Sequence, residues 1–247
     1  MNRMPSFWRH VNRVFQEADI IIEVLDARHI TETRNIEIEE KITKARKRIL
    51  YVVTKCDLVD INTLKHKIKN LNPVVFISST EKLGTTILKK KILELSKGEK
   101  VTVGVMGYPN VGKSSLINAL SGKGSARTST ESGYTKGVQK IKVDNKILLL
   151  DTPGVFPSME KDNAKHGKIG AIDYSKIKDP EYVALNLIEE QKEVIKKHYK
   201  ISENDGDKIL EAIAFKFKKV QKGGEPDIDA AARLLLKHWQ TGVIADL

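Results

Sequence analysis

Short runs of β-branched and other apolar residues alternate with amphipathic segments along the first 150 residues. Four runs are typical of strands buried on both faces, at 19–27, 48–53, 74–78 and 101–107. Between them, apolar residues recur at helical spacing, which predicts helices over 6–17, 36–45, 61–70, 85–96 and 113–121. Two more strands are expected over 137–143 and 146–151, joined by a tight Asp144-Asn145 turn. Strands that alternate with helices favour a mostly parallel, doubly wound sheet.

The strand pattern stops after Gly154. A loop is expected over about 155–168. Helices are predicted beyond it, over 180–199, 205–220 and 227–241. The sequence therefore predicts two domains, an α/β domain over residues 1–160 and a small all-α domain over residues 161–247.

The composition limits the class of protein. Of the 247 residues, 40% are hydrophobic and 30% are charged, which is enough apolar material for a packed core. A single cysteine excludes an internal disulfide framework and any site that needs several cysteines. No apolar run approaches the roughly 18–20 residues of a membrane-spanning helix, and the basic N-terminus lacks the apolar core of a signal peptide. A cytoplasmic protein without membrane contact is expected.

The net charge of +11 is unevenly distributed. Residues 1–155 hold 27 lysines and arginines against 16 acidic residues, whereas residues 156–247 hold 16 of each kind. A strongly basic protein commonly binds a polyanion, and nucleic acid is the leading candidate. A lysine-rich but merely solvated surface is the alternative that composition leaves open.

The segment GYPNVGKS, Gly107 to Ser114, fits the phosphate-binding pattern GxxxxGK[ST] and lies between an expected strand and an expected helix. Its glycines let backbone N–H groups surround phosphate, Lys113 can reach the β- and γ-phosphates, and Ser114 can bind Mg²⁺. The expected nucleotide contacts are Asn110, Val111, Gly112, Lys113, Ser114 and Ser115. The alternative is an ordinary turn before a helix.

Two further segments supply groups for a phosphate–Mg²⁺ site. In LLLDTPG, Asp151 ends a strand and could hold Mg²⁺ through water, while the N–H of Gly154 could contact a γ-phosphate. In GYTKG, the hydroxyl of Thr135 could complete the Mg²⁺ shell. Lys113, Thr135 and Gly154 are thus the expected catalytic groups, and Ser114, Thr135 and Asp151 the expected Mg²⁺ ligands. A capping or turn aspartate and an unremarkable loop threonine are the alternatives.

A base-binding site is expected from two other strand ends. In VVTKCDL the carboxylate of Asp57 can accept two hydrogen bonds from guanine, and adenine has no matching pair of donors. The aliphatic stem of Lys55 can lie over the base. In FISST the N–H of Ser79 could bind guanine O6. The expected base contacts are Thr54, Lys55, Asp57, Ser78, Ser79 and Thr80. Strand-end loops at one sheet edge converge on one crevice, so these groups should lie near the phosphate site.

Together these segments resemble the five motifs of translation-factor-class GTPases, but TKCD and ISST precede the phosphate loop. That order is similar to the YlqF/YawG family of circularly permuted GTPases, which act in large ribosomal subunit assembly. DARHITETRN resembles the family's DAR…RN segment, and the helical tail resembles its C-terminal domain. The resemblance covers nearly the whole chain. It implies a six-stranded Ras-like sheet with rewired connections, which is tolerable where the original termini lie close together.

The resemblance also implies a function. It points to a monomeric switch that binds GTP or GDP, uses Mg²⁺, hydrolyses GTP to GDP and phosphate, and contacts large-subunit rRNA. Asn110 resembles an asparagine that binds K⁺ in related GTPases, so K⁺ is a candidate second cation. Contacts of the γ-phosphate at Gly154 would order residues 155–168 and reposition the C-terminal helices.

Three residues depart from the family pattern. Thr54 replaces an asparagine that bridges to the phosphate loop, so guanine affinity is expected to be lower. Val155 stands where Ras-like enzymes carry a water-orienting glutamine, so intrinsic hydrolysis is expected to be slow and to need stimulation by ribosomal particles. His10 lies in an N-terminal helix, as a proposed catalytic histidine does in some relatives, but its surrounding sequence differs and a surface or packing role is favoured.

The RNA-contacting residues stay open at this point. The lysine-rich stretches Ile195–Lys200 and Phe215–Lys222 are candidates, and so are Lys89, Lys90 and Lys91 in the basic part of the chain. The competing function is a P-loop enzyme that acts on another RNA, in tRNA modification or small-subunit maturation, or one that uses ATP.

Overall fold

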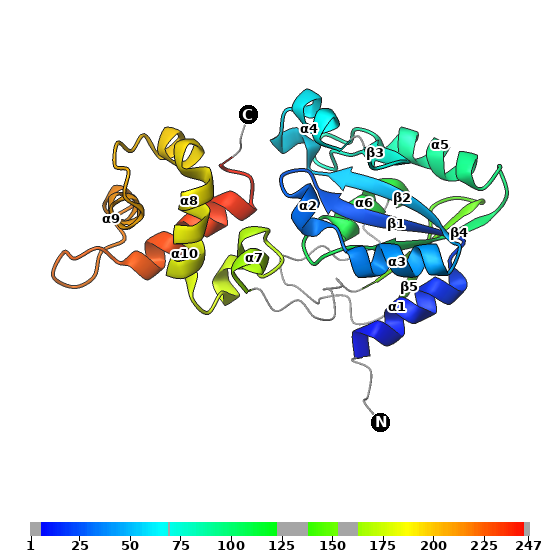
Figure 1. The fold of residues 1–247 in the computed structure, drawn as a ribbon, viewed down its shortest axis with the longest axis horizontal. Helices are drawn as coiled ribbons and strands as arrows, with labels where there is room; N and C mark the ends of the chain where they lie inside the picture. The colour runs from blue at the N-terminus through cyan, green and yellow to red at the C-terminus, as the bar shows by residue number, and fades with distance from the viewer. Residues whose placement is uncertain (1–5, 69, 123–137, 153–162, 245–247) are drawn as a thin grey trace. The chain divides into compact units, whose positions relative to one another are not determined.

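The computed structural model describes residues 6–68, 70–122, 138–152 and 163–244, and of residues 6–10, 67, 163 and 164 it describes the backbone only. The chain forms two compact units, Met1–Glu160 and Lys161–Leu247. Figure 1 shows the first as a sheet with helices packed on it and the second as a group of helices.

The first unit is built on six strands. They are β1 (Ile20–Asp26), β2 (Arg48–Thr54), β3 (Val74–Phe76), β4 (Val101–Met106), β5 (Gln139–Lys142) and β6 (Ile147–Asp151). Their order across the sheet is β3-β2-β1-β4-β6-β5, and every neighbouring pair is parallel except β5 and β6. The expected six-stranded, mostly parallel sheet is confirmed.

The turn of the β5–β6 hairpin depends on Asp144. Its Oδ1 atom accepts hydrogen bonds from the N–H groups of Lys146 (2.8 Å) and Ile147 (2.9 Å). Such an Asx turn fixes the chain reversal with one side chain. The tight turn expected at Asp144-Asn145 is therefore present.

The helices of the first unit follow the expected pattern with one addition. They are α1 (Ser6–Glu17), α2 (Ile30–Thr33), α3 (Ile36–Lys44), α4 (Ile61–Lys67), α5 (Thr85–Leu95) and α6 (Lys113–Ser121). The short α2 lies in DARHITETRN, a polar stretch between the strand predicted over 19–27 and the helix predicted over 36–45, where the pattern predicted no helix. The hydroxyl of Thr33 donates to the His29 carbonyl (2.7 Å) and closes this single turn.

Helices α1 and α3 share one face of the sheet (Figure 1). Val14 of α1 and Ile38 of α3 are fully buried in a cluster with Ile21 of β1 and Leu150 of β6. Gly104 of β4 allows this close approach, because a Cβ atom there would lie 2.4 Å from Val14 Cγ1. The helices are thus held firmly against the strands whose ends carry the motifs.

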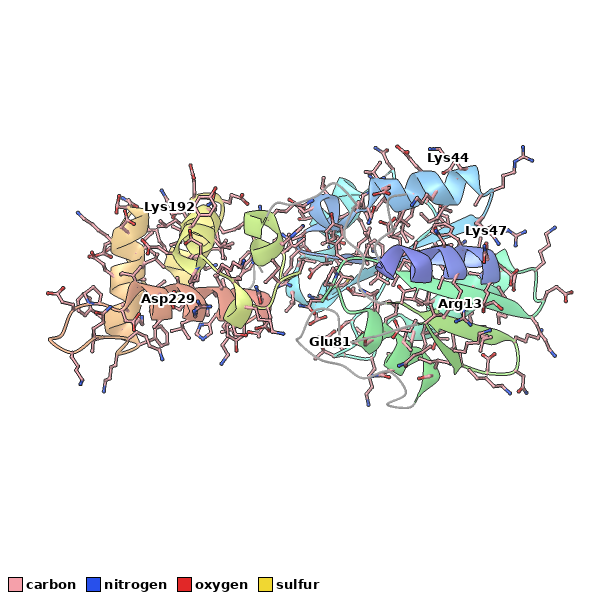
Figure 2. All side chains as sticks on the ribbon, turned by 90° about the horizontal axis from the view of Figure 1, so that it is seen from below. Arg13, Lys44, Lys47, Glu81, Lys192 and Asp229 are labelled. Atoms are coloured by element: carbon pink, nitrogen blue, oxygen red, sulfur yellow. The ribbon has the colours of Figure 1, made fainter. Side chains whose placement is uncertain are left out.

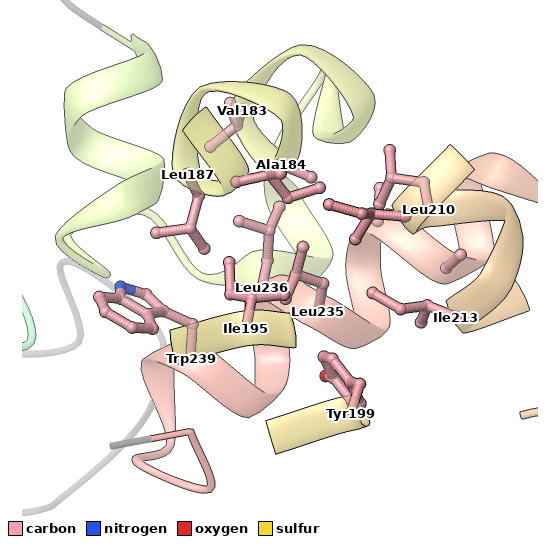
Figure 3. Packing of buried hydrophobic residues seen from close by; sticks show 14 of the residues in the cluster. Val183, Ala184, Leu187, Ile195, Tyr199, Leu210, Ile213, Leu235, Leu236 and Trp239 are labelled. Carbon is pink, nitrogen blue, oxygen red and sulfur yellow. The ribbon is translucent and has the colours of Figure 1, made fainter. Parts of the chain in front are cut away.

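The second unit consists of helices around a core of its own. They are α7 (Asn163–Lys168), α8 (Pro180–Tyr199), α9 (Gly206–Lys216) and α10 (Ile228–Gln240). Leu187, Leu210, Leu235 and Trp239 pack together between α8, α9 and α10 (Figure 3). The N-termini of α8, α9 and α10 are capped by the side chains of Asp179, Asp205 and Asp227, respectively.

Two expectations for this unit were wrong. Helix α7 occupies residues 163–168, the end of the segment expected to be a loop. Helix α9 ends at Lys216 instead of residue 220. The reason is a left-handed residue, Lys218 (φ 53°), followed by a hydrogen bond from the Lys219 N–H to the Ala214 carbonyl (2.8 Å). This is a Schellman closure, which stops a helix.

Charged side chains cover the outside of both units (Figure 2). Some form ion pairs one helical turn apart, such as Arg13 with Glu17 (2.7 Å) and Arg233 with Asp229 (2.8 Å). Exposed pairs of this kind add little stability. Among the described residues, every helix is too short or too polar to cross a bilayer.

Candidate functional site

The expected site residues follow the carboxyl ends of adjacent strands. β2 ends at Thr54, β4 ends at Met106 directly before the phosphate loop, and β6 ends at Asp151. β1 lies between β2 and β4, and its last residue, Asp26, pairs in register with Thr54. Because these strands are parallel, their ends lie at one edge of the sheet, where open α/β sheets bind ligands.

The phosphate loop has a backbone shape that requires glycine at two positions. At Gly107 (φ 146°) a Cβ atom would lie 2.5 Å from the Val24 carbonyl oxygen. Gly112 (φ 98°) directly precedes α6, and no side chain caps that helix. The N–H groups of the first turn of α6, which includes Ser114 and Ser115, are thus not held by a side-chain cap. This geometry fits a phosphate group.

Lys113 is the one charged residue of this loop, and it is buried. Its Nζ atom donates to the carbonyl oxygens of Gly107 (3.0 Å) and Tyr108 (2.5 Å). Burial lowers the pKa of Lys113 to about 8, and the negative charge of Asp151 opposes that shift. An ammonium that donates to two backbone carbonyls near the start of a helix is well placed to bind an anion.

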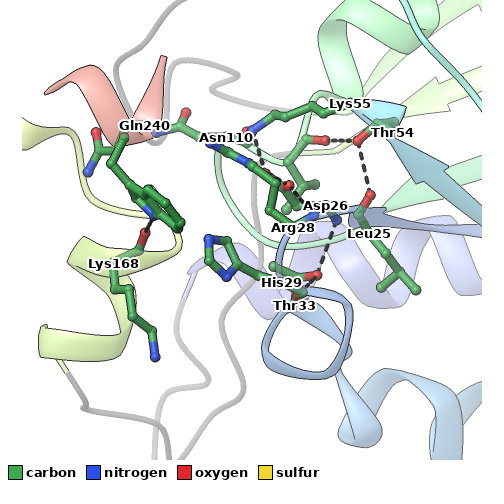
Figure 4. A network of polar contacts seen from close by, with 12 residues as sticks. Leu25, Asp26, Arg28, His29, Thr33, Thr54, Lys55, Asn110, Lys168 and Gln240 are labelled. Atoms are coloured by element: carbon green, nitrogen blue, oxygen red, sulfur yellow. Dashed lines mark hydrogen bonds and ion pairs between the residues drawn. The ribbon is translucent and has the colours of Figure 1, made fainter. Parts of the chain in front are cut away.

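Thr54 joins the base-binding loop to the phosphate loop. Its buried hydroxyl lies 2.5 Å from the Val111 carbonyl oxygen and 3.0 Å from the Leu25 carbonyl oxygen, and Figure 4 shows these contacts. Gly112 packs against the same side chain, because a Cβ atom added at Gly112 would lie 3.4 Å from Thr54 Oγ1. The threonine therefore makes a shorter version of the bridge for which the family pattern uses an asparagine.

The next residues of TKCD also face this region. Lys55 takes a left-handed backbone conformation (φ 58°), and its Nζ donates to the Asn110 carbonyl oxygen (3.0 Å). Asp57 lies in a 3₁₀ turn, η1 (Cys56–Leu58), and its Oδ1 atom is buried with no hydrogen-bond partner among the described residues. A buried acceptor without a donor is costly unless a ligand supplies one.

The loop after β3 is held by hydrogen bonds of Ser78. The Ser78 hydroxyl accepts from the Glu81 N–H (3.1 Å), and Ser78 and Leu83 form a backbone bridge. Gly84 (φ 84°) closes the loop, because a Cβ atom there would lie 2.1 Å from the Phe76 carbonyl oxygen. Ser79 and Thr80 lie within this loop, half-buried and exposed respectively.

Several expected residues lie outside the described residues, namely Thr135, Gly154 and Val155. His10 is described only as backbone within α1. Of the remaining candidates, the structure directly joins Thr54 to Val111 and Lys55 to Asn110.

Sequence reasoning assigned no role to Asp26 or Arg28, which lie directly beside Lys55. Asp26 Oδ2 is 2.6 Å from Lys55 Nζ and 2.8 Å from Arg28 Nη2. Burial alone would raise the pKa of Asp26, but the charges of Lys55 and Arg28 outweigh it and hold that pKa well below its usual range. The available signal was a carboxylate at the end of a buried strand, because a fully buried charge needs partners.

The described residues contain no group of three or more His, Cys, Asp or Glu side chains that could hold a metal ion. The oxygen donors present, the Ser114 hydroxyl and the Asp151 carboxylate, are those that Mg²⁺ prefers when phosphates supply further ligands. The site therefore fits a metal bound together with a nucleotide.

The chain is similar to several known GTP-binding proteins. The 50S ribosome-binding GTPase family model matches residues 102–216. The uncharacterized GTP-binding protein MJ1464 of Methanocaldococcus jannaschii is 38% identical over 94% of this chain and 64% of its own length. Nucleolar GTP-binding protein 2 of Saccharomyces cerevisiae is 32% identical over 96% of this chain and 52% of its own length. The chain thus spans about half to two thirds of the length of these curated relatives.

A solved structure matches along almost the whole chain. The crystal structure of GNP-bound YlqF from T. maritima is 25% identical and has a TM-score of 0.70, covering 98% of this chain and 96% of that one. The GDP-bound structure of the same protein has a TM-score of 0.69 at 24% identity, which supports the fold alone.

Proposed function

We propose that the chain is a circularly permuted GTPase similar to the YlqF/YawG family, which binds GTP, hydrolyses it to GDP and phosphate, and acts as a switch in assembly of the large ribosomal subunit. The observation that carries the proposal is the pair of contacts between TKCD and the phosphate loop, Thr54 to Val111 and Lys55 to Asn110. Segments more than 50 residues apart, in permuted order, thereby form one site.

Different residues of this chain are proposed to bind the guanine base, the phosphates and the cations. Asp57 accepts hydrogen bonds from two N–H groups of guanine, and the N–H of Ser79 donates to guanine O6. The backbone N–H groups at the start of α6 bind phosphate oxygens, and Lys113 exchanges its contacts with two loop carbonyls for the β- and γ-phosphates. Mg²⁺, held by Ser114, Thr135 and Asp151, would neutralise charge on the phosphates. Asn110 is proposed to support K⁺.

Hydrolysis is proposed to be slow in the isolated protein. Val155 has no group that could orient the attacking water, and Lys113 and Gly154 stabilise charge without activating a nucleophile. A stimulating group from a bound ribosomal particle would supply the missing function. The same particle would bind the GTP-bound protein more tightly than the GDP-bound protein.

An RNA-binding surface is proposed at the turn after α9. Residues 215–225 are all exposed, and they include Lys216, Lys218, Lys219 and Lys222 against one acid, Glu225. Phe215 is 55% exposed, and Phe217 is 38% exposed although its ring also packs edge-on against Tyr199 and His238. The turn is held by hydrogen bonds such as that from the Gln221 N–H to the Glu225 carbonyl (2.8 Å). Exposed aromatic rings among lysines suit RNA, since bases stack on the rings while phosphates pair with the ammonium groups.

Two triple variants distinguish this surface from the alternative one on α5. Lys218, Lys219 and Lys222 are changed to alanine in one, and Lys89, Lys90 and Lys91 in the other. The first is expected to weaken large-subunit RNA binding and to flatten its salt dependence, while the second changes both much less. A larger loss from the α5 variant would contradict the proposal.

The whole function is tested by GTP turnover with and without large ribosomal subunits, in K⁺ and in Na⁺. Stimulation by the particles, and co-sedimentation with them in a GTP analogue but not in GDP, are expected. Retention only on small subunits or tRNA would favour the alternative RNA substrate instead.

A further inference from the structure

Asp26 is at the centre of a buried charge cluster between the two halves of the proposed nucleotide site (Figure 4). Its Oδ2 atom accepts from Lys55 Nζ (2.6 Å) and Arg28 Nη2 (2.8 Å). Its Oδ1 atom accepts from Arg28 Nε (3.0 Å) and from the Arg28 backbone N–H (3.1 Å). Both carboxylate oxygens are therefore fully engaged.

The partners differ in their access to solvent. The Arg28 side chain is 6% exposed, whereas the Lys55 side chain is 25% exposed. Arg28 holds the carboxylate in place by a bidentate ion pair, a geometry with little freedom. Lys55 extends from that fixed carboxylate to the Asn110 carbonyl oxygen in the phosphate loop (3.0 Å).

Thr54 explains why such a second connection is useful. Its single hydroxyl can donate only one hydrogen bond, and it lies within reach of two carbonyl oxygens, those of Val111 and Leu25. An asparagine amide would offer two donor hydrogens at this position. The hydrogen bond from Thr54 therefore makes only part of the connection between the base-binding loop and the phosphate loop, and a second contact is needed to complete it.

We propose that Asp26 is a positioning residue for nucleotide binding, which fixes Lys55 against the phosphate loop and so completes the connection that Thr54 makes only in part. This inference rests on the proposed GTP-binding function. Asp26 does not touch the nucleotide; it acts through Lys55. Arg28 fixes Asp26 in turn.

The test is the dissociation constant of a fluorescent GDP analogue for the full chain. Asp26→Asn is expected to raise the Kd ~10-fold or more, because a charge-assisted hydrogen bond to Lys55 is lost. In a Lys55→Met background the same change is expected to add less than ~2-fold, since its effect passes through Lys55.

Glu39→Gln is the matched control. It removes a bidentate ion pair with Arg34 (2.6 and 2.8 Å) from α3, away from the strand ends. It is expected to lower the Tm but to change the Kd less than ~2-fold. If Asp26→Asn does not fold, the double variant Asp26→Asn/Arg28→Gln replaces it, because removing both charges leaves no buried arginine unpaired.

Equal Kd values for the wild type and Asp26→Asn would overturn the inference, and so would a full additional loss in the Lys55→Met background. In either case the wild type would still bind guanine nucleotides. A wild type that binds no guanine nucleotide would instead contradict the proposed function itself.

Discussion

Thr54 shows how much one hydroxyl contributes to the site, because it makes one of two direct links between the base-binding loop and the phosphate loop. Thr54→Val keeps the shape and removes the hydroxyl. We expect guanine nucleotides to bind ~5-fold more weakly, which corresponds to the loss of one ordinary hydrogen bond. Thr43→Val, on the exposed face of α3, removes a comparable hydroxyl and should leave nucleotide titrations unchanged. Equal affinities for both variants would contradict this role.

Glu23 is a buried carboxyl in the middle of β1, facing Glu39, Arg34 and Tyr51. Its Oε1 atom accepts from the Asn35 N–H (2.7 Å). Burial raises the pKa of Glu23 from 4.5 to about 8, while that hydrogen bond opposes the shift. The folded protein therefore holds a proton that the unfolded chain releases between these two pKa values.

This raised pKa makes stability fall as the pH rises. The contribution is complete below pH 4.5 and is lost as the pH approaches and passes about 8. Glu23→Gln keeps an acceptor for Asn35 and cannot ionise, so we expect a flatter profile and greater stability at pH 8. Denaturant unfolding at a series of pH values measures this. Parallel profiles for the two proteins would show that Glu23 does not titrate in this way.

At the scale of elements, the packing of α1 on the sheet depends on one glycine. A Cβ atom at Gly104 would lie 2.4 Å from Val14 Cγ1 and 3.0 Å from Ile21 Cδ1. Gly104→Ala should therefore cost about 1–3 kcal/mol of unfolding free energy, as overpacking does. Adding Val14→Ala removes the clashing methyl group, so the double variant should be no less stable than Val14→Ala alone. A further loss in the double variant would show that the remaining close contact with Ile21 Cδ1 also matters.

The elements themselves were largely predictable from the sequence, because strands buried on both faces produce largely apolar runs, as in β1, β2 and β4. The short α2 was not, since it depends on a threonine hydroxyl within a polar stretch. The early end of α9 was missed because it depends on the left-handed Lys218, which no glycine marks.

The motifs of the site were predictable, but the connections between them were not. GxxxxGK[ST] and TKCD are local patterns that indicate phosphate and base binding. The contacts of Thr54 with Val111, and of Lys55 with Asp26, join residues 57 and 29 positions apart, and only the strand order brings them together. A pattern along the chain contains no information on such distances.

At the scale of the whole molecule, each unit has a distinct part. The sheet unit holds the phosphate loop and the base motif, and it carries most of the basic excess. The helical unit has a net charge of only +1, with 16 basic against 15 acidic residues, but concentrates lysines and exposed phenylalanines at residues 215–225. Under the proposed function, the sheet unit binds the nucleotide and the turn in the helical unit contacts RNA.

The central claim is that base and phosphate motifs, permuted along the chain, form a single guanine-nucleotide site. The most direct measurement is a calorimetric titration of the wild type and Asp57→Asn with GTP, XTP and ATP in Mg²⁺. We predict that the wild type prefers GTP over both other nucleotides. We predict that Asp57→Asn prefers XTP, because asparagine has lost one of the two carboxylate oxygens that accept the guanine N–H groups. A wild type that binds ATP as well as GTP, or a variant with an unchanged preference, would contradict the claim.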